Sequence, residues 1–167
     1  MKKKVEERLK VSEDKLKSGG SGDGIDSKFI MQCLNRNEVG DGELFGRLYG
    51  DHFIYNKAMD CWMYWQGHHW KIDRMGYASS SVDGVANVYQ DEAKRVAEKI
   101  TELEGKGDDV GHLKARRKLL NQRITALRSH RRRKNCLFFA HTNNKYPLAI
   151  DGAEVDQKAW LLPCANG

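Results

Sequence analysis

Three runs of residues decide the expected fold class: His52-Phe-Ile-Tyr55, Cys61-Trp-Met-Tyr-Trp65 and His69-Trp-Lys-Ile72. Aromatic and β-branched side chains at this density are typical of strands. Turn-forming residues separate the runs, at 56–60 and at Gln66-Gly67. The sequence therefore predicts a small three-stranded antiparallel meander over about residues 52–73.

Helices are expected before this meander. Residues 27–35 place several apolar side chains on or near one helical face. Residues 35–42 then bring glycine, asparagine and aspartate together, which predicts a break. A second short helix is expected over 43–49, ended by Gly50.

The residues after the meander also predict helices. Apolar residues recur at helical spacing from Val82 to Leu103, and Gly105 follows. The helix expected over 110–129 has one apolar stripe, formed by Leu113, Leu120, Ile124 and Leu127. The helix expected over 131–141 should bury Leu137, Phe138 and Phe139. The fold class is therefore expected to be α+β, with the meander packed against mainly helical N- and C-terminal parts.

The length of 167 residues suits one main domain with a detached N-terminal segment. Residues 1–17 predict a charged helix with a thin apolar stripe. Residues 18–27 begin with Ser-Gly-Gly-Ser-Gly-Asp-Gly, which is the composition of a flexible linker. Residues 28–167 are expected to form the main domain, with a buried strand at Trp160-Leu-Leu162.

Positive charge is concentrated in one segment of the chain. The net charge is +6, and residues 114–134 contain ten basic side chains and no Asp or Glu. Subtracting these ten leaves −4 for the rest of the protein. The ten are Lys114, Arg116, Arg117, Lys118, Arg123, Arg128, Arg131, Arg132, Arg133 and Lys134. Such a cluster is typical of phosphate binding and predicts contact with the DNA backbone.

A structural role is the alternative interpretation of the basic segment. Ion pairs cannot form inside the segment, because it contains no acid. Partners would have to come from elsewhere, and the acidic stretch at 98–109 is the expected source.

The sequence offers no candidate for catalysis or for a metal. It contains no Gly-x-x-x-x-Gly-Lys-Ser/Thr loop, so ATP hydrolysis by this chain alone is not expected. No His-x-x-x-His or Cys-x-x-Cys pair occurs. Cys61 with His68 or His69 would be conceivable as a nucleophile and base, but a cysteine in a Trp-rich strand is more often part of the core. No stretch approaches a membrane span of about 20 apolar residues, and the four scattered cysteines indicate a reduced, intracellular protein.

The aromatic residues of the meander have two interpretations as well. Tryptophan and tyrosine can stack on unpaired bases. A small sheet also needs large side chains to bury one of its faces, so a role in the core is the simpler interpretation. Under that reading the exposed members would be Tyr55, Tyr64, His68 or His69.

The order of motifs resembles the region just upstream of the helicase motor in phage and plasmid primase-helicases, the family related to the poxvirus primase-helicase. The series begins with Asn37-Glu-Val-Gly-Asp-Gly-Glu-Leu-Phe-Gly-Arg-Leu-Tyr-Gly-Asp51 and continues with the Trp62-x-x-Trp65-x-Gly67-x-x-Trp70 hairpin. Basic helices follow, and then Trp160-Leu-Leu-Pro-Cys-Ala-Asn-Gly167. The resemblance covers roughly residues 28 to 167. The motif residues Glu38, Gly40, Trp62, Trp65, Trp70, Trp160, Asn166 and Gly167 are interpreted as structural.

The resemblance implies a replication protein of a phage or prophage, located in the cytoplasm of the bacterial host. In this family the region joins a primase module to a hexameric superfamily 3 helicase of the AAA+ type. ATP and magnesium would belong to that motor, and no cofactor is expected in this chain. The domain is therefore expected to be a non-catalytic connector or collar, cut short at its C-terminal end, whose partners are DNA (single-stranded or forked), its own helicase and primase domains and neighbouring subunits.

Two other functions fit the same residues. The basic helix could meet an acidic surface of another subunit, in a pure assembly module that does not bind DNA. Alternatively, helix 110–129 could enter a DNA groove in a small regulator, with Asn121, Gln122 and Thr125 as the available base-reading residues.

Overall fold

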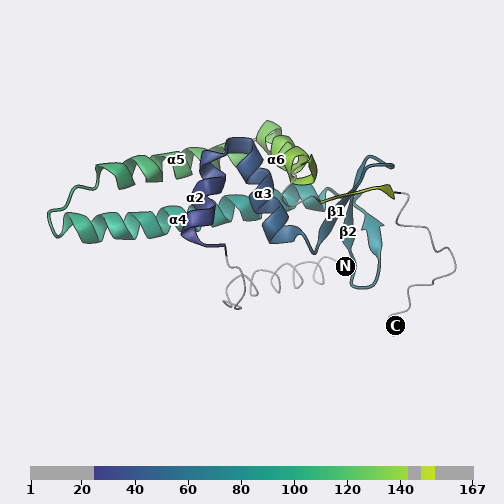
Figure 1. Ribbon diagram of the computed structural model, residues 1–167, viewed down its shortest axis with the longest axis horizontal. Helices are drawn as coiled ribbons and strands as arrows, with labels where there is room; N and C mark the ends of the chain where they lie inside the picture. The colour runs from purple at the N-terminus through teal and green to yellow at the C-terminus, as the bar shows by residue number, and fades with distance from the viewer. Residues whose placement is uncertain (1–24, 143–147, 153–167) are drawn as a thin grey trace.

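The computed structural model describes residues 25–142 and 148–152. Within them the chain forms helices, then a sheet, then helices again (Figure 1). In chain order the elements are α2 (Ser27–Asn35), α3 (Asn37–Tyr49), β1 (Phe53–Asn56), β2 (Cys61–Trp65), β3 (Trp70–Ile72), α4 (Tyr77–Glu104), α5 (Gly111–Leu127), α6 (His130–Thr142) and β4 (Ala149–Ile150). The expected helix at 1–17 and the expected strand at 160–162 lie outside the described residues.

The sheet has four strands in the order β3-β2-β1-β4. The antiparallel pairing of β1 with β2 and of β2 with β3 was expected, with Tyr55 opposite Trp62 and Trp65 opposite Trp70. The expectation of three strands was wrong, because β4 pairs in parallel with β1 and makes the sheet mixed. β4 is only two residues long, so it carries no periodic pattern that the sequence could reveal.

A long helical hairpin forms the other end of the molecule. α4 and α5 run antiparallel and extend away from the sheet, and α2 and α3 lie across them near the middle (Figure 1). α6 lies between this hairpin and the sheet (Figure 1). Among the described residues, no helix combines the length and the apolar character that a membrane span requires.

α3 is longer than expected. The sequence predicted a break at 35–42, but the helix begins at Asn37 and runs through both glycines of that segment. A β-carbon at Gly40 would overlap the carbonyl oxygen of Cys33 in α2, and one at Gly42 would lie 2.6 Å from the carbonyl carbon of Phe139 in α6. The glycines therefore allow close helix packing on both sides of α3 and do not end the helix.

A single residue turns the chain between α2 and α3. Asn37 has a positive φ of 58°, a conformation that asparagine tolerates better than most residues. This turn lets α3 begin immediately after α2 and fold back against it.

The core lies where α2, α3 and α6 meet the helical hairpin. The predicted stripe of Leu113, Leu120, Ile124 and Leu127 is buried in it. The prediction for α6 was wrong in part, because Phe138 is 54% exposed while Cys136 and Ala140 are buried. The face of α6 that meets α3 is formed by Cys136, whose thiol donates to the carbonyl of Asp41, and by the backbone at Phe139 and Ala140 beside Gly42, while Phe138 lies at the surface.

Candidate nucleic-acid interface

The ten basic residues of 114–134 divide into two equal groups in the structure. Five form ion pairs with acidic residues of other segments: Lys114, Arg116, Arg123, Arg132 and Arg133. The other five are exposed and have no ion pair within the described part of the chain: Arg117, Lys118, Arg128, Arg131 and Lys134. We call this second group the exposed cations.

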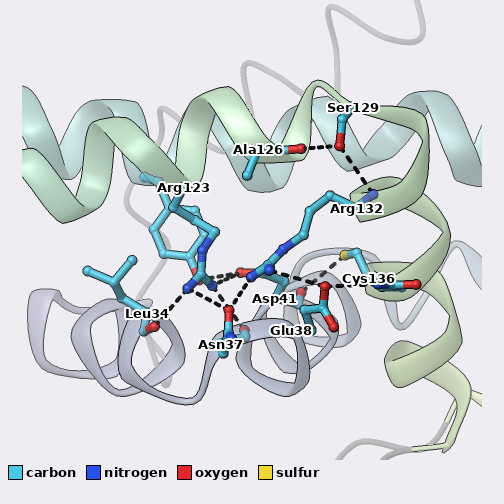
Figure 2. A network of polar contacts seen from close by, with 11 residues as sticks. Leu34, Asn37, Glu38, Asp41, Arg123, Ala126, Ser129, Arg132 and Cys136 are labelled. Atoms are coloured by element: carbon cyan, nitrogen blue, oxygen red, sulfur yellow. Dashed lines mark hydrogen bonds and ion pairs between the residues drawn. The ribbon is translucent and has the colours of Figure 1, made fainter.

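Asp41 of α3 is the centre of the largest ion-pair network (Figure 2). It is fully buried, and its carboxylate accepts from Nη1 of Arg123 at 2.7 Å and from Nε of Arg132 at 2.8 Å. The hydroxyl of Tyr89 donates to the same carboxylate at 3.0 Å. Two guanidinium groups and one hydroxyl thus replace the water that a buried carboxylate loses.

Residues at the start of α3 complete this network (Figure 2). The side-chain oxygen of Asn37 accepts from both guanidinium groups, at 3.1 Å from Arg123 and 2.7 Å from Arg132. Arg132 also donates to Glu38 at 3.1 Å. Asn37 therefore has two roles, since it provides both the positive φ of the turn and an acceptor for the two arginines.

Glu92 of α4 forms a second buried ion pair. Its carboxylate pairs with Arg116 of α5 and accepts from the hydroxyl of Ser27 at 2.6 Å. Arg116 also donates to Ser27, at 2.9 Å, so α2, α4 and α5 meet at this point. The remaining two pairs are more exposed and join Arg133 to Asp83 and Lys114 to Glu104.

The source of the acidic partners differs from the expected one. Of the stretch 98–109, Glu104 pairs with Lys114, whereas Glu38, Asp41, Asp83 and Glu92 lie outside it. Glu92 could have been found from the sequence, because it falls on the buried stripe of α4 between Tyr89 and Val96. Asp41 could not, because it lies in the segment that was expected to break.

The exposed cations lie on two neighbouring helices. Arg117 and Lys118 are on α5 and Arg128 is its C-cap, and the exposed residues Asn121, Gln122 and Thr125 lie between them in the sequence. On α6, Arg131, Lys134, Phe138 and His141 recur at intervals of three and four residues and so form one stripe. Nothing in the described structure tests whether these groups bind DNA, so the sequence prediction remains a prediction.

An aromatic pocket of about 460 Å³ lies at the sheet end of the α6 stripe. His141 stacks on Tyr55 with 3.8 Å between ring centres, and Trp62 and Phe138 meet the ring of His141 edge to face. Lys134 also lines the pocket. Trp62 and Tyr64 pack against the core, whereas Trp65, which was not among the residues expected to be exposed, is 42% exposed.

Several ionisable groups near these sites have shifted pKa values. Burial lowers the pKa of His141, with a further contribution from Lys57. The hydrogen bond to Asp60 raises the pKa of Tyr55 to about 12. Burial and the nearby Asp41 carboxylate raise the pKa of both Tyr89 and Cys136. All four shifts favour the neutral side chain.

The residues considered for catalysis or metal binding are not brought together. Cys61 begins β2, while His68 and His69 lie in the turn beyond the other end of that strand. Within residues 25–142 and 148–152, no group of three His, Cys, Asp or Glu side chains is placed to hold a metal ion.

Comparison with known proteins identifies the family. Residues 42–167, well over half of the chain, match the family model described as D5 N terminal like. A search of curated proteins and a search of solved structures gave no match. The match begins within α3 and includes the sheet, the helical hairpin and α6. The chain therefore belongs to the D5 N terminal like family, the N-terminal, non-motor domain of phage and viral D5 primase-helicase proteins, which act in DNA replication.

Proposed function

We propose that this domain is a non-catalytic connector or collar of a primase-helicase, which holds the DNA backbone through the exposed cations and contacts neighbouring subunits. The observation that carries this proposal is the division of the basic segment. Carboxylates on α3 and α4 pair with half of the cations, and the other half remains on the surface of α5 and α6. Unpaired lysines and arginines neutralise phosphates without reading sequence, which suits a component that moves along DNA.

The two arginines that pair with Asp41 are not free to contact phosphates. Arg123 and Arg132 are only 12% and 14% exposed and already donate to Asp41. Breaking these pairs would leave a buried carboxylate uncompensated, which costs about 3–5 kcal/mol. We therefore assign DNA contact to Arg117, Lys118, Arg128, Arg131 and Lys134.

The test is the salt dependence of DNA binding. Five phosphate contacts predict a log–log slope of about −3.5 for single-stranded DNA. Changing the five exposed cations to glutamine should bring this slope close to zero. The matched control changes five other exposed basic residues, outside α5 and α6, to glutamine: Lys28, Lys71, Arg74, Lys94 and Lys99.

The control removes the same charge and should retain most of the slope. Mobility-shift titrations at several salt concentrations would measure both variants. Equal losses in the two variants, or no binding by the native domain at low salt, would contradict the proposal.

An assembly module is the second candidate, because the exposed cations could also meet acidic side chains of another subunit. α4 exposes acids that suit such a contact, including Asp91, Glu98 and Glu102. Analytical ultracentrifugation separates the two functions. Oligomers that dissociate at high salt and are unaffected by DNA would favour assembly.

A sequence-specific regulator is a third candidate, because Asn121, Gln122 and Thr125 are exposed on α5 between the exposed Arg117 and Arg128. Competition between unrelated DNA sequences tests this function. Equal competition by all of them would exclude base reading by α5.

A further inference from the structure

The aromatic pocket at the end of α6 has the features of a ligand site. Its volume of about 460 Å³ lies within the usual range for small-molecule sites. Side chains from the sheet and from α6 form its walls, with Tyr55 and Trp62 on one side and Phe138 and His141 on the other. The rings of Tyr55, Trp62 and His141 contact one another, and Phe138 joins them through His141, so these contacts hold the walls in place.

Phe138 is the ring best placed to receive a partner. It is 54% exposed, although it is one of the largest apolar side chains in the domain. Its ring meets those of Phe139 and His141 edge to face and stacks flat on neither of them, and more than half of the side chain is exposed. A flat ligand could therefore stack on it, as bases stack on aromatic residues in single-strand binders.

Lys134 is the cation among the described residues that line the pocket, where it can pair with an anionic group of a ligand beside two lining carboxylates. Both lining carboxylates already have partners, since Asp60 accepts from the hydroxyl of Tyr55 and Asp73 accepts from the backbone N–H groups of Tyr77 and Ala78 at 2.9 Å. Lys134 has no ion pair within the described residues and lies one helical turn before Phe138. Arg131 lies one turn earlier on the same stripe.

The buried Nδ1 of His141 has no hydrogen-bond partner among the described residues. Because its ring is packed against Tyr55 and Trp62, this atom cannot reach water by a simple rotation. The packed ring of His141 therefore forms a fixed part of the pocket wall, and its buried Nδ1 carries a desolvation cost.

We propose that this pocket accepts one unpaired nucleobase of single-stranded DNA, which stacks on Phe138 while Lys134 and Arg131 hold the adjoining phosphates. This proposal rests on the proposed function, because the same strand would continue along the exposed cations. Pocket and cations then have different tasks. The cations bind any backbone, and the pocket selects strands whose bases are free.

The test compares a single-stranded oligothymidylate with an oligonucleotide of the same length that has abasic residues throughout and with a duplex. The native domain should bind the base-bearing strand about 5- to 150-fold more tightly than the abasic strand. Phe138→Ala should abolish this preference and leave both duplex affinity and the salt slope unchanged. Leu119→Ala, which removes another exposed apolar side chain, 51% exposed, on α5, should keep the preference.

The outcomes separate the two proposals. Binding that depends on salt but not on the presence of bases, or a Phe138→Ala variant with native preference, would overturn the base pocket and leave the backbone function intact. Absence of salt-dependent binding would overturn both. Lys134→Gln tests the phosphate contact separately. It should reduce the salt slope by about 0.7, whereas Phe138→Ala should leave the slope unchanged. Thermal melting of each variant verifies that the domain is folded.

Discussion

Asp41 shows how one charged residue can organise several helices. Its side chain is fully buried in α3, yet it receives hydrogen bonds from α4, α5 and α6 through Tyr89, Arg123 and Arg132. Apolar contacts alone would let these helices slide or rotate with little penalty. A buried carboxylate with directional donors fixes their relative positions, because any displacement leaves a charge without its partner.

Asp41→Asn should destabilise the domain by about 3–5 kcal/mol, because two largely buried guanidinium groups would lose their main counter-charge. Urea denaturation followed by circular dichroism would measure the change. Asp91→Asn is the control, since Asp91 is 62% exposed and its ion pair is with the exposed Lys94, and its effect should stay within about 0.5 kcal/mol. Equal unfolding midpoints for the two variants would contradict the structural role of Asp41.

His141 should make the stability of the domain depend on pH. Burial lowers its pKa in the folded state, so below about pH 6.5 the unfolded chain binds the proton more readily. Stability should therefore fall as the pH drops from about 7 through 6.5 towards the lowered pKa of the folded state. Thermal melts across this range should show a smaller decline for His141→Gln than for the native protein. The exposed His68 provides the comparison, and His68→Gln should decline as the native protein does.

At the scale of elements, periodicity predicted those parts of the fold in which burial follows a repeating pattern. The three meander strands and the α4, α5 and α6 helices are present, with ends close to those expected except that α4 begins at Tyr77, five residues before the expected Val82. α3 was predicted only in part, because glycine, asparagine and aspartate normally indicate a break. Here Gly40 and Gly42 are glycines because the backbones of α2 and α6 pass close to them, and the local sequence does not reveal this close packing. The basic segment was found as a whole. Its division depends on distant acids such as Asp41, which lies 82 residues before Arg123 and 91 before Arg132, and no spacing rule applies over such distances.

Gly40→Ala should destabilise the domain although alanine is the better helix former. The new β-carbon would overlap the backbone of Cys33 and force α2 and α3 apart, so we expect a loss of about 1–3 kcal/mol. Gly105→Ala is the matched control, because its β-carbon would make ordinary contacts at 3.5 Å and its φ of −63° suits alanine. That change should be neutral or stabilising by up to about 1 kcal/mol. Chemical denaturation would compare the two, and a neutral Gly40→Ala would show that the helices need no close approach.

The sheet lies at one end of the long axis and the tip of the α4–α5 hairpin at the other, with α2 and α3 across the hairpin between them (Figure 1). Beyond α2 and α3, the hairpin is held by a seam between α4 and α5 that includes Ile100, Val110 and Leu113. The exposed pair of Lys114 with Glu104 adds little there. Fewer layers of buried side chains should make this end open more easily than the core.

Hydrogen exchange should therefore follow a gradient along α4. Amides near residues 98–104 should exchange before those near Val82 and Val85, which lie in the broad core, because opening the hairpin end exposes less apolar surface. Mass spectrometry of peptic fragments would measure both sets in one experiment. Uniform protection along α4 would show that the hairpin and the core unfold as one unit.

The Asp41 network also has a consequence for synthesis of the protein on the ribosome. The carboxylate is translated 82 residues before Arg123 and 91 residues before Arg132. Until both arginines have left the exit tunnel, the nascent chain holds an acid that cannot be desolvated at acceptable cost. Contacts of such high sequence separation form late and favour a cooperative transition. The emerging domain should therefore remain open until α6 has been made, and the apolar faces of α2 and α3 should stay accessible to solvent during that interval.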